Sequence, residues 1–316
     1  MIRKKDGIHV NQDVKHVLDS RNSIGDTNFV SHAHSDHAFK KNGEIICSKL
    51  TEKLLQKRFN ADVKRVEHDS IQLIDSGHIL GSSAALIDGK ILYTGDVSTR
   101  DRAYIEGFQP VEAKELIIEA TYGIPAYRFP DQEEIERSIQ DWVEENSNPL
   151  FLFAYALRKA QKIQYLVQEV TERPIIAHGS VLKMNNVLEK HTDLEFNTLP
   201  YKENKDLLKE DGIYIGPTST SKKQYINKLV SQNNGLKAGF SGWALHNSMG
   251  YSRYDKAFPF SDHCDFNELV ELVEQVEPEK VYTHHGFDEQ FASYLRREKG
   301  FNARALKNNQ SSLTDF

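Results

Sequence analysis

Four side chains that can bind a metal ion lie within six consecutive positions near the N-terminus: His32, His34, Asp36 and His37. They follow an apolar segment that ends at Val30. If the chain leaves a strand there, the two-residue period of a strand places His32 and His34 on one side, where they can share an ion. Asp36 and His37 need a tightened turn to face a second ion nearby. Imidazole suits zinc and similar ions, and a carboxylate among imidazoles leaves a position for water. A polar surface loop is the alternative interpretation.

Length and composition limit the class of protein that must position these residues. The 316 residues are enough for two domains, or for one large domain with an insertion. Hydrophobic residues make up 39% of the chain and, with the 18 glycines, approach the globular norm of about 45–50%, which excludes a largely disordered chain. The 40 basic and 46 acidic residues give a net charge of −6, so binding to a polyanion requires a local basic surface or bound cations.

The two cysteines, Cys47 and Cys264, cannot build a disulfide framework or a cysteine-rich zinc module, and they indicate a reducing compartment. Residues 1–10 include basic side chains but no apolar signal region. The longest apolar run, residues 150–157, is far shorter than the span of about 18 residues that a bilayer requires. We therefore expect a soluble, cytoplasmic protein.

The elements expected along the chain indicate an α/β protein. Residues 1–120 are rich in strand patterns, with a hairpin around Asp88-Gly89 and a strand at 115–119. From residue 121 strands and helices alternate, which predicts a parallel sheet with helical crossovers. The strands expected there are 150–155, 174–178, 212–215 and 236–240, and the helices are 131–146, one that ends near 170, 181–191 and 222–230.

The C-terminal part returns to a helix, a strand and a helix, at 266–276, 280–283 and 288–299. We expect these elements to pack on the N-terminal sheets. The domains predicted are therefore a discontinuous one, formed by residues 1–120 and 261–316, and an inserted one at 121–260.

The histidine motif is similar to the signature of the metallo-β-lactamase superfamily, and further residues extend the resemblance in order. His78, within residues 76–82, resembles the third imidazole of that fold's first metal site. Asp96, within residues 93–98, resembles the carboxylate that bridges two metals. Asp19 resembles the fold's first motif, a carboxylate that supports the ligands, and a simple turn former is the equal alternative.

Three more residues are similar to the motifs of the β-CASP nucleases of this superfamily. Glu119 resembles the acidic motif that begins their inserted domain, His263 the second motif and His285 the third. Because neighbours in a strand point to opposite faces, only one of His284 and His285 can reach the metals, and we favour His285. Histidine at the third motif is typical of the RNA-processing branch, whereas valine is common in the branch that repairs DNA cross-links.

The resemblance covers essentially the whole chain and is closest to short, single-chain exonucleases associated with DNA ligase or similar to archaeal messenger-RNA 3′-end-processing enzymes. The matching segments are 122–128, 153–161, 241–243 and 285–287. The larger RNA-processing members also have N-terminal KH domains and long C-terminal extensions, which this sequence lacks, so dimerisation or sequence-selective RNA binding is not expected from those parts. The resemblance implies a metallo-β-lactamase αββα sandwich with an inserted α/β β-CASP cap.

The resemblance also implies a mechanism, in which two divalent metals, Zn²⁺ or Mn²⁺, activate a hydroxide that attacks a phosphodiester. His263 would act as general acid, oriented by Glu119. The expected partners are single strands or ends of DNA or RNA and an associated DNA ligase or helicase. The ligands implied are His32, His34 and His78 for one metal, Asp36, His37 and His285 for the other, and Asp96 between them; Asp36 is also assigned a catalytic role.

Four residues of the inserted domain are candidates for substrate binding. Arg158 and Lys159 could contact phosphate, or could belong to the solvated face of an amphipathic helix. Ser241 belongs to a matching segment, and His178 lies where helix amides could hold a phosphate, with core packing as the alternative. Four aromatic residues could stack unpaired bases, although aromatics at these spacings more often belong to a core: Tyr122, Tyr127, Phe129 and Trp243.

Other classes of protein share some of these residues. A hydrolase of thioesters or lactones would keep the ligands but would not need Glu119, His263 or so large an insertion. A non-catalytic nucleic-acid-binding relative would typically lose ligands, and none is missing here. A flavodiiron oxidoreductase normally has glutamate where this chain has His34, which argues against iron redox chemistry.

Overall fold

A computed structural model describes residues 1–22, 24–38, 42–246 and 253–307 of the chain. It consists of two compact units, each described here by itself. Unit 1 comprises Met1–Asp101, Ile105–Arg128 and His263–Phe316, and unit 2 comprises Arg102–Tyr104 and Phe129–Asp262.

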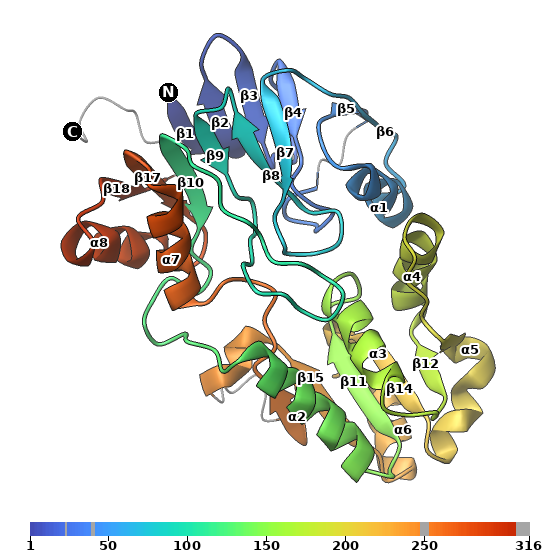
Figure 1. Ribbon diagram of the computed structural model, residues 1–316. Helices are drawn as coiled ribbons and strands as arrows, with labels where there is room; N and C mark the ends of the chain where they lie inside the picture. The colour runs from blue at the N-terminus through green and yellow to red at the C-terminus, as the bar shows by residue number, and fades with distance from the viewer. Residues whose placement is uncertain (23, 39–41, 247–252, 308–316) are drawn as a thin grey trace. The chain divides into compact units, whose positions relative to one another are not determined.

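The first sheet of unit 1 is built from its N-terminal residues (Figure 1). The strand order is β1-β2-β3-β4, antiparallel up to β3 and parallel between β3 and β4. A separate two-stranded sheet, β5-β6, flanks helix α1 in the sequence. The bounds are β1 Ile2–Lys5, β2 Gly7–Asn11, β3 Lys15–Leu18, β4 Thr27–Phe29, β5 Gly43–Ile45, α1 Lys49–Phe59 and β6 Val63–Arg65.

The second sheet of unit 1 has the order β18-β17-β10-β9-β8-β7. Its strands β7, β8 and β9 are antiparallel, and β8 and β9 form the hairpin expected from Asp88-Gly89. Both turn residues have positive φ, 51° and 63°, as a tight hairpin turn requires. From β9 to β18 the pairing is parallel. The bounds are β7 Ile71–Asp75, β8 Ser83–Ile87, β9 Ile91–Tyr93, β10 Glu115–Glu119, β17 Lys280–His284 and β18 Ala303–Ala305.

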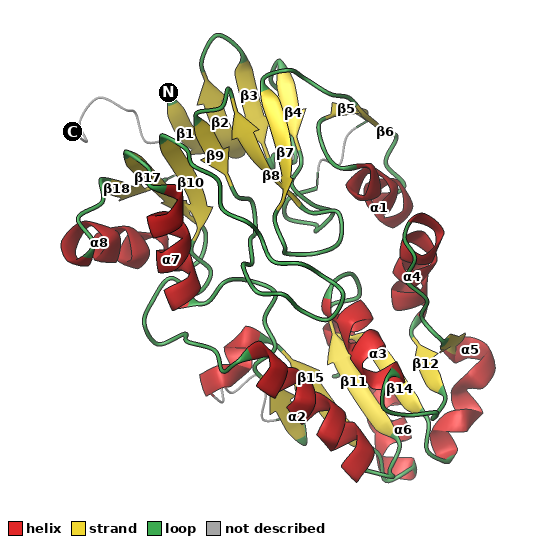
Figure 2. Cartoon of the chain, viewed as in Figure 1, coloured by secondary structure: helices red, strands yellow, loops and turns green. Residues whose placement is uncertain are grey.

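Apolar side chains fill both faces of this second sheet. On one face, Phe29 and Val10 of the first sheet belong to the same buried cluster as Ile87 and Ile117 of the second. On the other face, the buried residues of helices α7 (Phe266–Val276) and α8 (Asp288–Glu298) share a cluster with β9 and β10 (Figure 2). Helices therefore cover the outer face of a two-sheet sandwich, and the α/β fold class expected from the sequence is confirmed.

Unit 2 is built on a six-stranded parallel sheet with the order β13-β12-β14-β11-β15-β16. All five residues of the central strand β11 are buried, which explains its uninterrupted apolar sequence. Helix α2 begins after Asp131, whose carboxylate accepts the backbone N–H groups of Glu133 and Glu134. The strands are β11 Leu150–Ala154, β12 Ile175–Ala177, β13 Thr198–Pro200, β14 Ile213–Pro217, β15 Leu236–Phe240 and β16 Lys256–Phe258. The helices are α2 Gln132–Glu145, α3 Lys159–Gln168, α4 Gly179–His191, α5 Tyr201–Asn204, η1 Lys205–Lys209, η2 Thr218–Thr220, α6 Gln224–Gln232 and η3 Gly242–His246.

A segment of three residues, Arg102–Tyr104, belongs to unit 2 although it lies far from the rest of that unit in the sequence. The backbone N–H of Ala103 donates to Glu136 at 3.2 Å, and the ring of Tyr104 lies 5.3 Å from that of Tyr165. In the part of the chain that the structure describes, no helix is both long enough and apolar enough to cross a bilayer.

Candidate metal centre

The ends of four strands in unit 1 bring the candidate ligands to one place. Strands β7, β9, β10 and β17 all run in the same direction, so the residues that follow them meet at one edge of the sheet. His78 follows β7, Asp96 follows β9, Glu119 ends β10, and His285 follows β17. Gly95 allows the turn before Asp96, because its φ is 57° and a Cβ atom there would lie 2.7 Å from Ser31.

Three imidazoles and one carboxylate form a first donor set. The Nε2 atoms of His32 and His78 lie 2.8 and 3.4 Å from Nδ1 of His34, and 3.6 and 3.5 Å from Oδ2 of Asp96. All four residues are buried. A tetrahedral ion with bonds of about 2.1 Å separates its ligands by about 3.4 Å, which most of these distances match. The residues therefore fit a divalent metal ion.

Asp96 also faces a second group of donors. Its other oxygen, Oδ1, lies 3.5 Å from Nε2 of His37, and Oδ2 of Asp36 lies 3.8 Å from the same nitrogen. Half of the Asp36 side chain is exposed, whereas His37 is mostly buried. Because the two oxygens of Asp96 are directed to different donor groups, this carboxylate is placed to join them.

Asp19 supports both the motif loop and His37. It accepts hydrogen bonds from the backbone N–H and hydroxyl of Ser31 at 2.7 and 2.6 Å, and from the Tyr93 hydroxyl at 2.7 Å. It also lies 2.8 Å from Nδ1 of His37, which leaves Nε2 directed at the donors described above. Its φ is 47°, so it is a turn residue as well as a supporting carboxylate. No motif or periodicity in the sequence marks Tyr93 for this role.

We expect Asp19→Asn to weaken metal binding by about 10–100-fold, the usual cost of losing a partner of a metal-binding histidine. The amide has nearly the same shape, but its NH₂ group cannot accept the hydrogen bonds from Tyr93 and His37. Isothermal titration of the metal-stripped protein with Zn²⁺ measures this change. An affinity equal to that of the wild type would show that Asp19 is only a turn former.

The charges of this site favour a cation. Burial opposes protonation of His37, but Asp96, Asp19 and Asp36 together raise its pKa to about 10. The pKa of Asp96 is raised overall, chiefly by burial and also by the nearby Glu119. His37 and His285 oppose this shift only in part. The site thus holds several carboxylates with little positive charge to balance them. A divalent ion would supply the missing positive charge.

The histidine pair at the end of β17 is divided between two environments. His284 is buried against the ring of Tyr93 with centroids 5.6 Å apart, and burial lowers its pKa to about 3. His285 has left the strand with a φ of 65°, is exposed, and contributes to the electrostatic field at Asp96. Gly286 is required next, because a Cβ atom there would lie 2.4 Å from the carbonyl oxygen of Ala120. His284 therefore belongs to the core, and His285 is the member of the pair that we keep as the candidate ligand.

Glu119 and His263 form a buried pair beside Asp96. Nδ1 of His263 lies 2.8 and 2.9 Å from the two carboxylate oxygens of Glu119, which also accept the Val97 N–H at 2.7 Å and the Thr121 hydroxyl. Burial opposes ionisation of Glu119, but His263 and these hydrogen bonds lower its pKa to about 2. An ionised carboxylate only accepts, so Nδ1 of His263 donates. Atoms of Asp96, Glu119 and His263 lie within 4.8 Å of one another.

In unit 2, the substrate-binding candidates Arg158 and Lys159 have a partner that we did not expect. Nε of Arg158 and Nζ of Lys159 each lie 2.8 Å from Oδ2 of Asp262, and Nζ of Lys162 lies 2.8 Å from Oδ1. We call these four residues the Asp262 cluster. Their side chains are at most 11% exposed, so the interpretation of a solvated helix face is wrong. The carboxylate of Asp262, rather than solvent or a phosphate, is thus the direct partner of these basic side chains.

The Asp262 cluster is expected to matter for stability. Burial tends to raise the pKa of Asp262, but the surrounding cations lower it more. The pKa of this carboxyl therefore lies well below its usual range. We expect Asp262→Asn to lower the free energy of unfolding by about 3–5 kcal/mol, because the buried cations lose their counter-charge. Urea denaturation measures the difference. Asp206→Asn is the control: Asp206 pairs with Lys209 on the surface, where solvent screens the pair, and the substitution should leave stability nearly unchanged. Equal effects of the two substitutions would contradict the expectation.

The structure also gives partners to His178 and Ser241. Nδ1 of His178 accepts the backbone N–H of Ser180 at 3.1 Å, so the imidazole itself caps helix α4 where we expected room for a phosphate. Ser241 is 5% exposed, and its hydroxyl accepts the backbone N–H of Trp243 at 3.3 Å. In both residues the polar side-chain atom accepts a hydrogen bond from a backbone amide two positions further along the chain, and not from a substrate.

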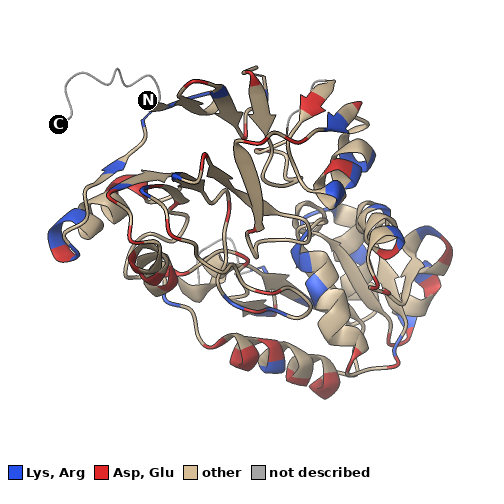
Figure 3. Ribbon diagram, turned by 45° about the horizontal axis from the view of Figure 1, so that its top comes forward, with Lys and Arg blue, Asp and Glu red and all other residues tan. Residues whose placement is uncertain are grey.

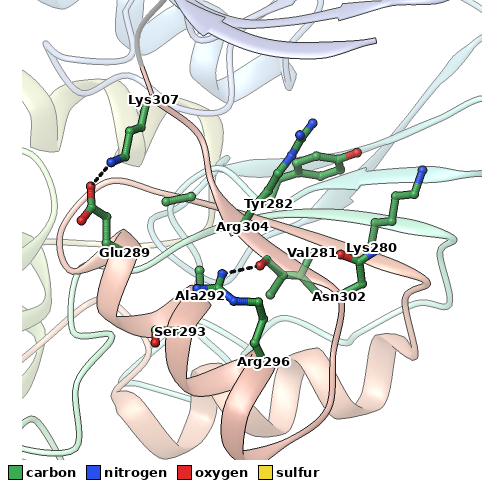
Figure 4. Close-up of a pocket in the computed structure, with 12 residues that line it drawn as sticks. Lys280, Val281, Tyr282, Glu289, Ala292, Ser293, Arg296, Asn302, Arg304 and Lys307 are labelled. Carbon is green, nitrogen blue, oxygen red and sulfur yellow. Dashed lines mark hydrogen bonds and ion pairs between the residues drawn. The ribbon is translucent and has the colours of Figure 1, made fainter. Parts of the chain in front are cut away.

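A pocket of about 570 Å³ lies elsewhere in unit 1, between β17, α8 and β18 (Figure 4). Glu289 is the one carboxylate among its lining residues, and it pairs with Lys307 at 2.5 Å. Arg296 donates to the carbonyl oxygen of Ala303 at 2.6 Å. The pocket is lined by the beginning of β17, whereas His285 follows its end, so this cavity is separate from the metal ligands.

Comparisons with known proteins agree with this layout of candidate metal donors. Residues 256–306 match the family model described as the Zn-dependent metallo-hydrolase RNA specificity domain. The chain is 32% identical to a "Probable DNA ligase" of Opitutus terrae over 90% of this chain, but it spans only 29% of that relative's length. It is 26% identical to "Probable RNase MJ4" of Methanocaldococcus jannaschii, over 94% of this chain and 90% of the relative.

Among solved structures, a protein of unknown function from Enterococcus faecalis V583 is similar in fold, with a TM-score of 0.56 and 16% identity. The similarity covers 81% of this chain and 74% of that one. Taken with the named relatives, the matches extend over nearly the whole chain. The family match and the named relatives indicate the β-CASP nuclease family of the metallo-β-lactamase superfamily.

Proposed function

We propose that the chain hydrolyses phosphodiester bonds of DNA or RNA and acts as an exonuclease. The observation that carries this proposal is the buried Glu119–His263 pair next to Asp96. A thioester or lactone hydrolase would use the metal donors but has no need for an oriented proton donor beside them. The pair therefore favours a reaction with a poor leaving group, such as the 3′ or 5′ oxygen of a nucleotide.

We assign two divalent ions to the donors, with Zn²⁺ as the first candidate and Mn²⁺ as the second. When bound, such a pair supplies an activated water at neutral pH and neutralises charge on the phosphodiester. We assign His32, His34 and His78 to one ion, Asp36, His37 and His285 to the other, and Asp96 to both. Asp19 keeps Nε2 of His37 turned toward the second set.

His263 supplies the proton that the leaving oxygen needs. Its Nδ1–H is committed to Glu119, so Nε2 is the nitrogen from which a proton can pass to substrate. Glu119 holds the ring in one orientation through Nδ1, so Nε2 is the atom available for general acid catalysis. Because Thr121 and Val97 also donate to Glu119, its carboxylate is fixed before substrate binds.

The substrate we propose is a single strand or an end, bound with help from an inserted cap domain at residues 121–260; residues 1–120 and 261–316 form the catalytic domain. The exposed side of α2 cannot contribute to binding a polyanion, because α2 has six acidic residues and one basic one (Figure 3). The names of the relatives support action in repair or RNA processing and hint at a DNA ligase as a partner; a helicase is the alternative partner that we propose. Two free, buried cysteines support a cytoplasmic location.

A digestion time course tests this function. DNA and RNA oligonucleotides labelled at either end are incubated with the full chain and with Zn²⁺, Mn²⁺ or Mg²⁺. We expect metal-dependent release of short products from one end of at least one substrate. A thioester and a lactone are assayed in parallel under the same metals. Turnover of either of these without cleavage of any oligonucleotide would overturn the proposal.

A further inference from the structure

Two aromatic side chains are exposed just beyond the C-terminal ends of two neighbouring strands of the unit 2 sheet. Tyr155 directly follows β11 and is 55% exposed, and Trp243 lies in η3 just after β15 and is 39% exposed. Strands β11 and β15 are parallel neighbours, with Phe153 opposite Gly239, so the two residues follow adjacent strand ends. Adjacent strands lie about 4.8 Å apart. Large aromatic rings are usually buried, because burial of each removes much apolar surface from water.

The Tyr155 ring is held by the Asp262 cluster. The guanidinium of Arg158 lies over the ring at 4.8 Å from its centroid, and the ammonium of Lys159 lies at 5.7 Å. Both cations are fixed in turn by Asp262. The ring is thus oriented before any ligand arrives, and it still leaves more than half of its residue surface open. A ring held on cations in this way differs from a mobile surface tyrosine.

Charge distinguishes these strand ends from other parts of unit 2. The positively charged side chains under Tyr155 attract phosphate, whereas the acidic residues of α2 repel it. Proteins that bind single strands combine positive charge with aromatic rings on which successive bases stack. An unpaired strand therefore matches the chemistry of these strand ends better than a duplex, whose bases are already stacked.

We propose that Tyr155 and Trp243 form a stacking subsite for unpaired bases of a nucleic-acid strand. The inference rests on the proposed function, since the strand is that reaction's substrate. The Asp262 cluster has three basic side chains against one carboxylate, so its excess positive charge attracts the phosphates without contacting them, while the bases contact the rings. The subsite acts in binding and not in the chemical step.

Binding to strands with and without bases tests the subsite. Fluorescence anisotropy in EDTA, which prevents hydrolysis, measures Kd for a labelled oligothymidylate of about 12 nucleotides and for an abasic strand of equal length. Tyr155→Ala and Trp243→Ala should each weaken oligothymidylate binding by about 5–150-fold. Neither should change binding of the abasic strand. Tyr155→Phe keeps the stacking ring and should bind as the wild type does. Tyr225→Ala, which removes another exposed ring of unit 2, is the matched control and should have no effect.

The outcomes separate this inference from the proposed function. Loss of binding to both strands alike would mean that Tyr155 acts through charge or folding, and would overturn the stacking role. Unchanged binding in both alanine variants would overturn it as well. If the wild type prefers strands with bases but cleaves none of them in the digestion assay, the stacking subsite stands and the nuclease function fails. If the wild type cleaves the oligonucleotides while the alanine variants bind them normally, the nuclease function stands and the stacking subsite fails. An oligouridylate arm decides whether RNA is bound in the same way.

Discussion

Replacing His34 with alanine is expected to abolish hydrolysis and remove the first metal ion together. Nδ1 of His34 lies within 3.4 Å of the donor nitrogens of both His32 and His78, so it is the central member of the first donor set. Changing a residue that only supports a ligand costs about 10–100-fold in metal affinity. Loss of a ligand itself should therefore exceed about 100-fold. Metal content by atomic emission and oligonucleotide cleavage are measured on the same preparation.

His191→Ala is the control for His34→Ala. His191 is exposed at the end of α4 and belongs to neither donor set. We expect it to keep full metal content and full cleavage. A His34→Ala protein that retained both properties would remove this histidine from the centre. Cleavage without the first metal ion would contradict the dependence of the reaction on that ion.

Replacing His263 with alanine should slow turnover by about 10²–10⁴-fold while the metal content stays unchanged. His263 contacts Glu119 and lies beside the donors, but its Nδ1 is used for the carboxylate and not for metal. The loss should shrink for a phosphodiester with a nitrophenolate leaving group, which departs without a proton. The measurement therefore compares kcat for an oligonucleotide and for a bis-nitrophenyl phosphate.

Glu119→Gln supplies the companion variant. The amide keeps the size of the side chain but has one acceptor oxygen where the carboxylate has two, so it holds the ring of His263 less firmly and should show the same dependence on leaving group in weaker form. An equal loss on both substrates in His263→Ala would mean that His263 maintains the site's structure. An unchanged kcat would remove it from the mechanism.

Local signals were enough to predict much of the fold. The Asp88-Gly89 turn predicted a hairpin because only residues that tolerate positive φ fit its tight turn, and β8 and β9 form it. The apolar run at 115–119 is β10, and Asp131 predicted the start of α2 because its carboxylate can cap the first amides. The short motif marked His32 and His34 as candidate donors, the family resemblance added His78 and Asp96, and the structure brings these four together.

Contacts between distant residues could not be predicted in this way. Tyr93 supports Asp19 across 74 positions, and no periodicity marks a hydroxyl for that role. Lys162 pairs with Asp262 across 100 positions, so the charges of α3 looked like a solvated face when the helix was considered alone. The segment 102–104 joins unit 2 through contacts that its three residues cannot reveal by themselves.

Anomalous diffraction from crystals grown with Zn²⁺ tests the central claim most directly. We predict two zinc peaks per chain, one among His32, His34, His78 and Asp96, and a second between Asp96, Asp36, His37 and His285. A chain whose zinc lies away from these side chains, or that binds none when Zn²⁺ is in excess, would contradict the account.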